Sequence, residues 1–279
     1  MEYLIHLVIL ISIYSILGLS LNLVVGYTGL LSVAQAAFYG IGAYATAILM
    51  TGFGINFYLS LVLGMILAAL AAFLVGLVLS KFKGDYYALV SLGFNVIIFS
   101  VFLNWQSLTR GPLGIPGIPR PAPPFLLVAL AALALVYFFC RFLVNSSFGR
   151  TLMAIREDEK AIQIFGYQTH HFKLAIFTIS AALAAVAGSL FASYISFIDP
   201  STFSLNESVF ILAIIIFGGL ADLRGSVLGA LFLILLPEAL RFVGFPPDVA
   251  AQMRQLIYGL ILIGLMLYRP QGLIGRYKL

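Results

Sequence analysis

The chain has 279 residues, of which 62% are hydrophobic and 9% are charged, and its mean hydropathy is +1.11. A soluble domain is roughly 45 to 50% apolar, so this composition excludes one and predicts an all-α integral membrane protein. The formal net charge of +5 comes from basic residues that lie mostly between apolar runs, where they set orientation, and no nucleic-acid partner is expected. The single cysteine, Cys140, excludes an internal disulfide.

Apolar runs separated by Gly, Pro and charged residues predict about nine transmembrane helices, within a range of eight to ten. The second run begins among glycines and the seventh and eighth are short, so some of these helices are expected to be broken or re-entrant. The predicted spans are Tyr3–Val25, Leu30–Met50, Phe57–Leu79, Tyr86–Asn104, Pro124–Val144, Phe172–Ile195, Glu207–Ala221, Ser226–Leu240 and Gln252–Tyr268.

The distribution of Lys and Arg predicts the orientation. If the loop that contains Lys81 and Lys83 is cytoplasmic, strict alternation of nine spans places eleven basic residues inside and four outside. This excess agrees with the positive-inside rule, so we expect an external N-terminus and a cytoplasmic C-terminus. The whole chain, residues 1–279, is predicted to form one membrane domain.

Two loops stand out between the predicted spans. Residues 105–124 hold six of the eleven prolines together with three glycines, and this content predicts an extended, non-helical external loop. Residues 145–173 form a long internal loop that contains "IREDEK" at 155–160, with five consecutive charges. We expect Arg150 to Phe165 to form one short amphipathic helix that Gly166 ends, and Thr169 to cap the next span.

The charged loop helix has two interpretations from the residues alone. It is either a solvated helix stabilised by charge pairs one turn apart, or a docking helix for a soluble partner, since an apolar stripe edged by mixed charge suits an interface. A wider comparison of motifs favours docking. Six stretches carry it: "LSLNLVVGYTGLLSVAQAAFYGIGAYATAIL" (19–49), "GDYYALVSLGF" (84–94), "LTRGPLGIPGIP" (108–119), "NSSFGRTLMAIREDEKAIQIFGYQTHHFKLAIFTISAALAAVAGSLFA" (145–192), "FGGLADLRGSVLGA" (217–230) and "RPQGLIG" (269–275).

In this order the six stretches resemble the branched-chain amino-acid permease family of ABC importers, in particular its LivM type. The resemblance implies a permease subunit in the cytoplasmic membrane of a bacterium or archaeon, with branched-chain amino acids as substrates. It implies a homologous H-type permease, two ATPase subunits that bind ATP and Mg, and a substrate-binding protein as partners, besides membrane lipid. It also implies that the loop at 145–173 couples transport to the ATPases, through Arg156, Glu157, Asp158, Glu159 and Gly166.

Other functions remain as alternatives. A urea or short-chain amide permease of the same superfamily has a similar membrane chain, and nothing in the residues separates these substrates. The chain has no G-x-x-x-x-G-K-[ST] run, so ATP hydrolysis is expected on partners and not here. A proton-coupled carrier usually needs an ionisable group well inside a span, and it is disfavoured because six acidic residues lie at or near predicted span ends: Asp85, Asp199, Glu207, Asp222, Glu238 and Asp248. A membrane scaffold or an intramembrane enzyme is disfavoured because no catalytic constellation is evident.

Polar residues inside the spans are candidates for the substrate path, with helix packing as the alternative role for the glycines beside them. Glu207, before a helix start, is interpreted as a partner of the helix dipole rather than as a substrate ligand. His170 and His171 lack a third ligand, so no metal site is expected. The path candidates are Asn22, Tyr27, Ser32, Gln35, Ser91 and Asn95. The glycines expected to break helices or allow close packing are Gly26, Gly29, Gly40, Gly42, Gly218, Gly219, Gly225 and Gly229.

Overall fold

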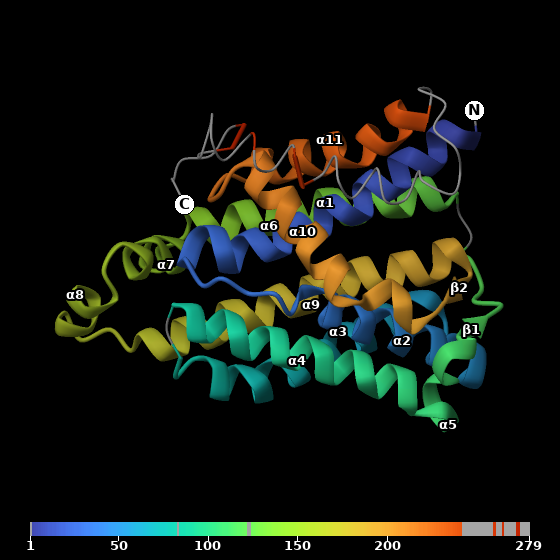
Figure 1. The fold of residues 1–279 in the computed structure, drawn as a ribbon, viewed down its shortest axis with the longest axis horizontal. Helices are drawn as coiled ribbons and strands as arrows, with labels where there is room; N and C mark the ends of the chain where they lie inside the picture. The colour runs from blue at the N-terminus through green and yellow to red at the C-terminus, as the bar shows by residue number, and fades with distance from the viewer. Residues whose placement is uncertain are drawn as a thin grey trace.

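The computed structural model describes residues 2–82, 84–121 and 124–241, with residues 259, 260, 264, 272 and 273 (Figure 1). This part of the chain is almost entirely helical, as the composition predicts. Its elements are α1 (Glu2–Thr28), α2 (Gln35–Phe53), α3 (Phe57–Leu79), α4 (Asp85–Asn104), α5 (Gln106–Thr109), η1 (Gly111–Leu113), β1 (Ile115–Pro116), α6 (Phe125–Asn145), α7 (Ser147–Glu157), α8 (Glu159–Ile164), α9 (Thr169–Ile195), β2 (Phe197–Ile198), η2 (Pro200–Phe203), α10 (Leu205–Gly218) and α11 (Leu223–Arg241).

Six of the described helices are long and apolar enough to cross a membrane, namely α1, α2, α3, α4, α6 and α9. The seventh and eighth predicted spans correspond to α10 and α11, which bend by 119° at their junction and together qualify as one broken span. The described residues therefore contain six spans, or seven with the bent pair, and the count of nine is not confirmed. The ninth predicted span, 252–268, lies almost wholly outside the described residues.

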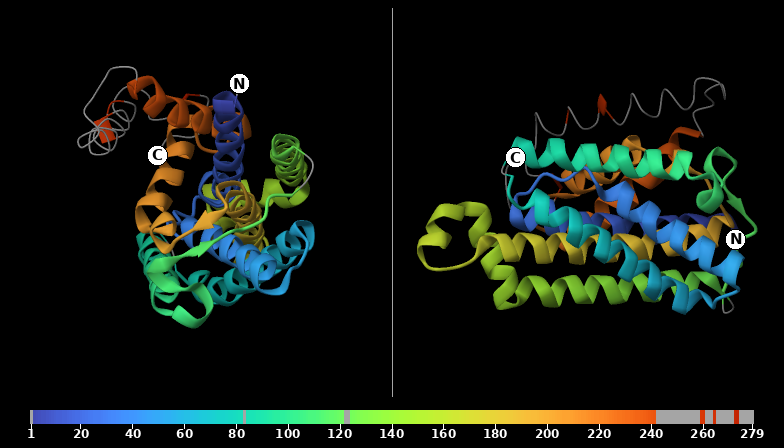
Figure 2. Two further views of the ribbon diagram at one scale, coloured as in Figure 1. Left: turned by 90° about the vertical axis from the view of Figure 1, so that its right-hand side faces the viewer. Right: turned by 90° about the horizontal axis from the view of Figure 1, so that it is seen from below.

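The centre of the bundle is α9, which packs against α1, α2 and α3 (Figure 2). Its middle is rich in small residues, "SAALAAVAGS" at 180–189, and most of these are fully buried. Small side chains allow helix backbones to approach closely in a membrane, where apolar burial alone gives little driving force. Gly188 shows the effect, since a Cβ atom there would lie 2.1 Å from the Tyr39 carbonyl oxygen of α2.

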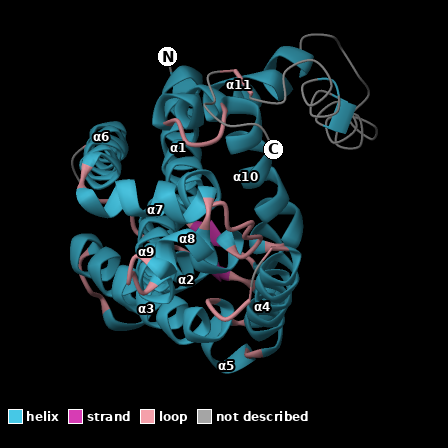
Figure 3. Ribbon diagram, turned by 90° about the vertical axis from the view of Figure 1, so that its left-hand side faces the viewer, coloured by secondary structure: helices cyan, strands magenta, loops and turns pink. Residues whose placement is uncertain are grey.

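The outer helices present large apolar side chains away from this centre. Leu74 of α3, Leu89 of α4 and Phe142 of α6 are 65%, 63% and 76% exposed. Such exposure would be unfavourable in water but suits contact with lipid chains. Seen end-on in Figure 3, α6 stands on one side of the molecule and α4 and α10 on another.

The loop at 105–124 is more structured than the sequence predicts. The expectation that it contains no helix is wrong, because α5 forms one turn before the first proline, and η1 tolerates Pro112 among its first residues. After Gly114, β1 pairs antiparallel with β2, with Ile115 opposite Ile198. This strand pair attaches the loop to the end of α9.

The predicted single helix from Arg150 to Phe165 is in fact two helices, α7 and α8. Asp158 breaks the helix with extended φ and ψ of −152° and 100°, and its side chain accepts hydrogen bonds from the N–H groups of Lys160 and Ala161 at 2.9 and 3.1 Å. Asp is a favoured N-cap, so α8 starts here instead of continuing α7. Gly166 follows α8 with φ of +87°, which agrees with the predicted stop.

Candidate coupling surface and transport-path residues

The first half of the charged loop, α7, is fixed to the membrane helices. Leu152 and Ile155 on one face are only 1% and 4% exposed, and α7 contacts α6, α1 and α9. At its start the Ser146 hydroxyl accepts a hydrogen bond from the N–H group of Gly149. The apolar stripe of α7 is therefore used within the chain.

The second half, α8, protrudes beyond the end of the bundle (Figure 1). Ile164 and Phe165 are 85% and 78% exposed, and Tyr167 is half exposed. The predicted apolar stripe thus divides between two roles, because its α7 part is buried while Phe165 projects into the surroundings. This exposed apolar tip, defined by Ile164, Phe165 and Tyr167, is a surface suited to a partner protein.

A compact polar joint connects α8 to the start of α9. The Glu159 carboxylate accepts a hydrogen bond from the Thr169 hydroxyl at 3.0 Å and forms an ion pair with Lys173 at 2.7 Å. Gln163 donates to the same hydroxyl at 2.8 Å. The helix α9 begins at Thr169 and Gln168 takes the N-cap position, so the prediction that Thr169 caps this helix is wrong. The lysine is 4% exposed, so the joint is largely shielded from solvent.

The charged loop also contacts the break between α1 and α2. Arg156 donates a hydrogen bond to the carbonyl oxygen of Gly26, in the last turn of α1. Its aliphatic stem covers Gly29, where an added Cβ would lie 3.0 Å from the arginine Cγ. Gly29 has φ of +70°, a conformation that favours glycine. Arg156 thus links α7 to the point where the first helix ends.

Between α1 and α2 the residues 29–34 are not helical and lie against α4. Ser91 accepts a hydrogen bond from the Val33 N–H at 3.0 Å, and Asn95 donates one to the Val33 carbonyl at 2.9 Å. Irregular backbone inside a membrane requires such partners, since lipid offers none. Two of the predicted path residues therefore hydrogen-bond this segment.

The start of α10 meets the start of α2 at the same place. The Ser208 hydroxyl accepts hydrogen bonds from the Ala36 N–H at 2.9 Å and from the Asn95 amide at 2.5 Å. Asn95 is the eleventh residue of the 20-residue helix α4, so this meeting point lies close to the middle of the membrane.

Asn22 stabilises the second break, between α10 and α11. Its amide nitrogen donates to the Asp222 carbonyl at 3.0 Å and the Ser226 hydroxyl at 2.7 Å, and its amide oxygen accepts from the Ala221 N–H at 3.0 Å. Ala221 has a positive φ of 57°. Asn22 thus stabilises, through its hydrogen bonds, the turn at which α10 and α11 bend.

The remaining path candidates are also buried and contacted by the chain itself. Gln35 donates to the Ser20 hydroxyl at 2.6 Å, and the Ser32 hydroxyl accepts a long bond of 3.4 Å from the backbone. Tyr27 lines a polar cavity of 310 Å³ with Arg141 and Asp222, near the α7 end. The structure brings the candidates to the two helix breaks, and their role in transport stays a prediction.

The candidate glycines lie at close backbone contacts. A Cβ atom on Gly42 would lie 2.4 Å from the Ala185 backbone of α9, and one on Gly40 would lie 2.5 Å from the Phe102 ring. Gly219 has φ of +118° at the α10–α11 bend. Close approaches of the same kind occur at Gly26, Gly218, Gly225 and Gly229.

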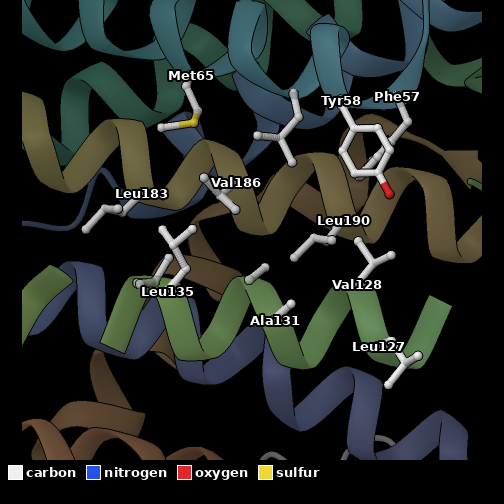
Figure 4. Close-up of a pocket in the computed structure, with 13 residues that line it drawn as sticks. Phe57, Tyr58, Met65, Leu127, Val128, Ala131, Leu135, Leu183, Val186 and Leu190 are labelled. Carbon is white, nitrogen blue, oxygen red and sulfur yellow. The ribbon is translucent and has the colours of Figure 1, made fainter. Parts of the chain in front are cut away.

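An apolar groove of 530 Å³ lies between α3 and α6, over α9 (Figure 4). Met65, Leu135, Leu183 and Leu190 are among the side chains that line it, and Tyr58 supplies its one hydroxyl. A zwitterion needs several polar partners when it leaves water, so this groove is poorly suited to an amino acid.

One polar contact was missed by sequence reasoning. The Tyr14 hydroxyl of α1 donates a hydrogen bond to the Glu207 carboxylate at 2.7 Å. Glu207 lies in the first turn of α10, as its predicted dipole role requires. The two residues are 193 positions apart, and no local spacing could have indicated that they meet.

Comparison with known sequences agrees with the resemblance. Residues 3–266 match the family described as branched-chain amino acid transport system / permease component. The chain is 36% identical to the LivM permease of the high-affinity branched-chain amino acid transport system of Escherichia coli, over 94% of this chain and 68% of that protein.

More distant relatives cover nearly the same region. The probable LivM permease of Methanocaldococcus jannaschii is 26% identical, over 94% of this chain and 90% of its own. The LivH permease of Escherichia coli is 26% identical over 95% and 92%. No solved structure matches. This chain therefore belongs to the branched-chain amino acid transport permease family, in which it is a multi-pass membrane protein of the LivM type.

Proposed function

We propose that this chain is the permease subunit of an ATP-driven importer of branched-chain amino acids in the cytoplasmic membrane of a bacterium or archaeon. The observation that carries the proposal is the exposed apolar tip of α8, joined to the central helix α9 by the Glu159–Lys173 ion pair. A protruding apolar surface attached to the most buried helix is the arrangement that a mechanical input from outside the membrane needs.

The proposed cycle starts at the partners. Two ATPase subunits bind ATP and Mg, close, and move α8. Because Glu159 contacts both Thr169 and Lys173, α9 follows that movement. Through its hydrogen bond with Gly26, Arg156 transmits the same movement to the break between α1 and α2. The pathway then alternates between outward and inward access.

The remaining partners follow from the family. A homologous H-type permease pairs with this chain, as the relatives named LivM and LivH suggest. A soluble binding protein delivers the amino acid at the opposite end of the bundle from α8. The binding protein selects the substrate, and the permease supplies the pathway.

Transport measured in liposomes tests the function. The chain is reconstituted with its partner permease, ATPases and binding protein, and ATP-dependent uptake of labelled leucine is compared with that of labelled urea. We expect leucine uptake that stops when the ATPases are omitted. Uptake of urea alone would overturn the substrate and favour the urea or short-chain amide alternative.

Substitutions in the charged loop test the coupling. Arg156→Ala, Glu157→Ala and Asp158→Ala are each expected to lower leucine uptake more than ATPase activity. Arg156 links α7 to Gly26, Asp158 caps α8, and the exposed Glu157 lies beside that cap, on the proposed docking surface. The matched control is Arg150→Ala, an exposed residue of the same loop. Normal coupled uptake in all three variants would reject the docking role.

A further inference from the structure

Glu207 lies near the middle of the membrane although it begins a helix. Its partner Tyr14 is 12 residues from the start of α1 and 14 from its end, which at 1.5 Å per residue is about 18 and 21 Å. The neighbouring Ser208 bonds Asn95, halfway along α4. Glu207 lies near a helix end, as the sequence predicts, but this end is inside the bundle because α10 starts there.

Two groups beside this carboxyl group can stabilise its charged form. The Tyr14 hydroxyl donates to it, and the N-terminus of α10 offers the positive end of the helix dipole. Among the side chains that the structure describes, no Lys or Arg forms an ion pair with Glu207. A carboxylate placed at this depth without a cationic partner is characteristic of a transport or binding site.

A second polar group lies close by without a partner. The Tyr39 hydroxyl is fully buried and makes no hydrogen bond within the described residues, yet it is close enough to Tyr14 and Glu207 to interact with both electrostatically. Buried hydroxyl groups are nearly always satisfied, by protein, water or ligand. Tyr39 therefore has unused hydrogen-bonding capacity in the neighbourhood of the carboxylate.

The same face of α10 is open on its outer side. Asn206 is exposed, Val209 is 49% exposed, and Tyr14 and Glu207 are partly exposed. Lipid does not accommodate an exposed amide and carboxylate at mid-membrane depth, so this face borders water or a polar partner surface. This differs from α3, whose exposed side chains are apolar.

We propose that Glu207, held in place by Tyr14, binds the ammonium group of the transported amino acid halfway across the membrane. This inference rests on the proposed function and deepens it. An ammonium group pairs with a carboxylate through short, charge-assisted hydrogen bonds, and the Tyr39 hydroxyl supplies a further contact. The Phe210 ring, edge-on to Tyr14 with centroids 5.5 Å apart, provides an apolar wall for the aliphatic side chain. A neutral solute such as urea would gain no ion pair here.

Uptake by the complete reconstituted complex provides the first test. Glu207→Gln keeps the size of the side chain and removes its charge, so we expect leucine uptake by the assembled complex at limiting concentration to fall roughly tenfold or more. Glu207→Asp should restore part of the uptake. Asp85→Asn, which removes a carboxylate at the start of α4, is the control and should leave uptake unchanged. Wild-type uptake by Glu207→Gln would overturn the proposal.

Cysteine labelling gives a readout that a structural role would not produce. On a Cys140→Ala background, a cysteine at Glu207 should react with a water-soluble cationic thiol reagent, and leucine with binding protein and ATP should slow the reaction. The control is Leu67→Cys, a half-exposed residue midway along α3, which should stay unreactive. A Glu207→Cys variant as unreactive as Leu67→Cys would overturn the site.

The two proposals fail in different ways. Absence of leucine uptake by the wild-type complex would reject the proposed function. The labelling experiment does not depend on transport, and it would still decide whether Glu207 faces a water-filled pathway. Normal leucine uptake together with an unreactive Glu207→Cys and an active Glu207→Gln variant would reject the ammonium site alone.

Discussion

Asn22 forms three hydrogen bonds to the α10–α11 junction and is fully buried. We expect Asn22→Ala to lower the stability of the purified protein by about 1 to 3 kcal/mol, because the Ala221 N–H loses its side-chain partner at a buried site. The measurement is thermal unfolding in detergent. Asn104→Ala is the control, since Asn104 is exposed and bonds only within α4. Equal melting temperatures for the two variants would contradict the role assigned to Asn22.

At the residue scale, sequence reasoning located polar residues better than it assigned their partners. The sequence indicates Asn22 and Asn95 as polar residues inside apolar spans, and both are fully buried. Asn22 bonds the carbonyl of Asp222, 200 residues away, and Asn95 bonds the carbonyl of Val33, 62 residues away. A single sequence carries no signal for such pairs. The same distance in sequence concealed the Tyr14–Glu207 contact.

At the scale of elements, α8 carries a prediction about coupling. Phe165 is 78% exposed, so Phe165→Ala should leave the melting temperature unchanged but reduce ATP-dependent uptake severalfold, because only the contact with a partner is lost. The control is Phe142→Ala on α6, where the ring is 76% exposed towards the apolar surroundings. Uptake and ATPase activity are measured in the same liposomes. If both variants transport normally, the tip of α8 is not a docking surface.

The contact of α2 with α9 carries a second prediction at this scale. Gly188→Ala would place a Cβ atom 2.1 Å from the Tyr39 carbonyl oxygen and 2.8 Å from the Ala43 nitrogen. We expect a loss of stability of about 1 to 3 kcal/mol, since two backbones must separate. Gly93→Ala on α4 meets no atom within 4 Å and should be neutral or slightly stabilising. The comparison of the two melting temperatures decides whether close backbone packing holds the centre together.

The elements themselves followed from hydropathy to within a few residues for α1, α3, α4 and α6, because a membrane span needs an uninterrupted apolar run. The failures lie where local chemistry overrides that pattern. Asp158 divides the amphipathic loop helix by capping α8, and the backbone at 29–34 leaves the helix because α4 offers hydrogen-bond partners. The pairing of Ile115 with Ile198 depends on contact between distant segments.

At the scale of the whole molecule, the orientation is open to direct test. With Cys140 replaced by Ala, a cysteine at Ser201 should react with a membrane-impermeant maleimide on intact cells, and one at Lys160 should react only after the membrane is opened. The reason is that the α7–α8 end carries the excess of basic residues. Both positions are exposed, so poor access within the protein does not complicate the comparison. Labelling of Lys160→Cys on intact cells would reverse the orientation.

The strand pair at the other end of the molecule gives α9 a fixed point about which the helix can tilt. The Ser196 carbonyl accepts hydrogen bonds from the Gly117 and Ile118 N–H groups at 3.0 and 3.3 Å, which fixes the end of α9 farthest from α8. A helix of 27 residues is about 40 Å long, so a tilt of about 5° around that fixed end would displace the α8 end by about 3.5 Å. Residues at mid-membrane depth would move half as far. The tilt axis of α9 is therefore fixed by a loop on the side of the membrane away from α8. If that loop were loosened, movement of α8 would shift the whole helix instead of tilting it.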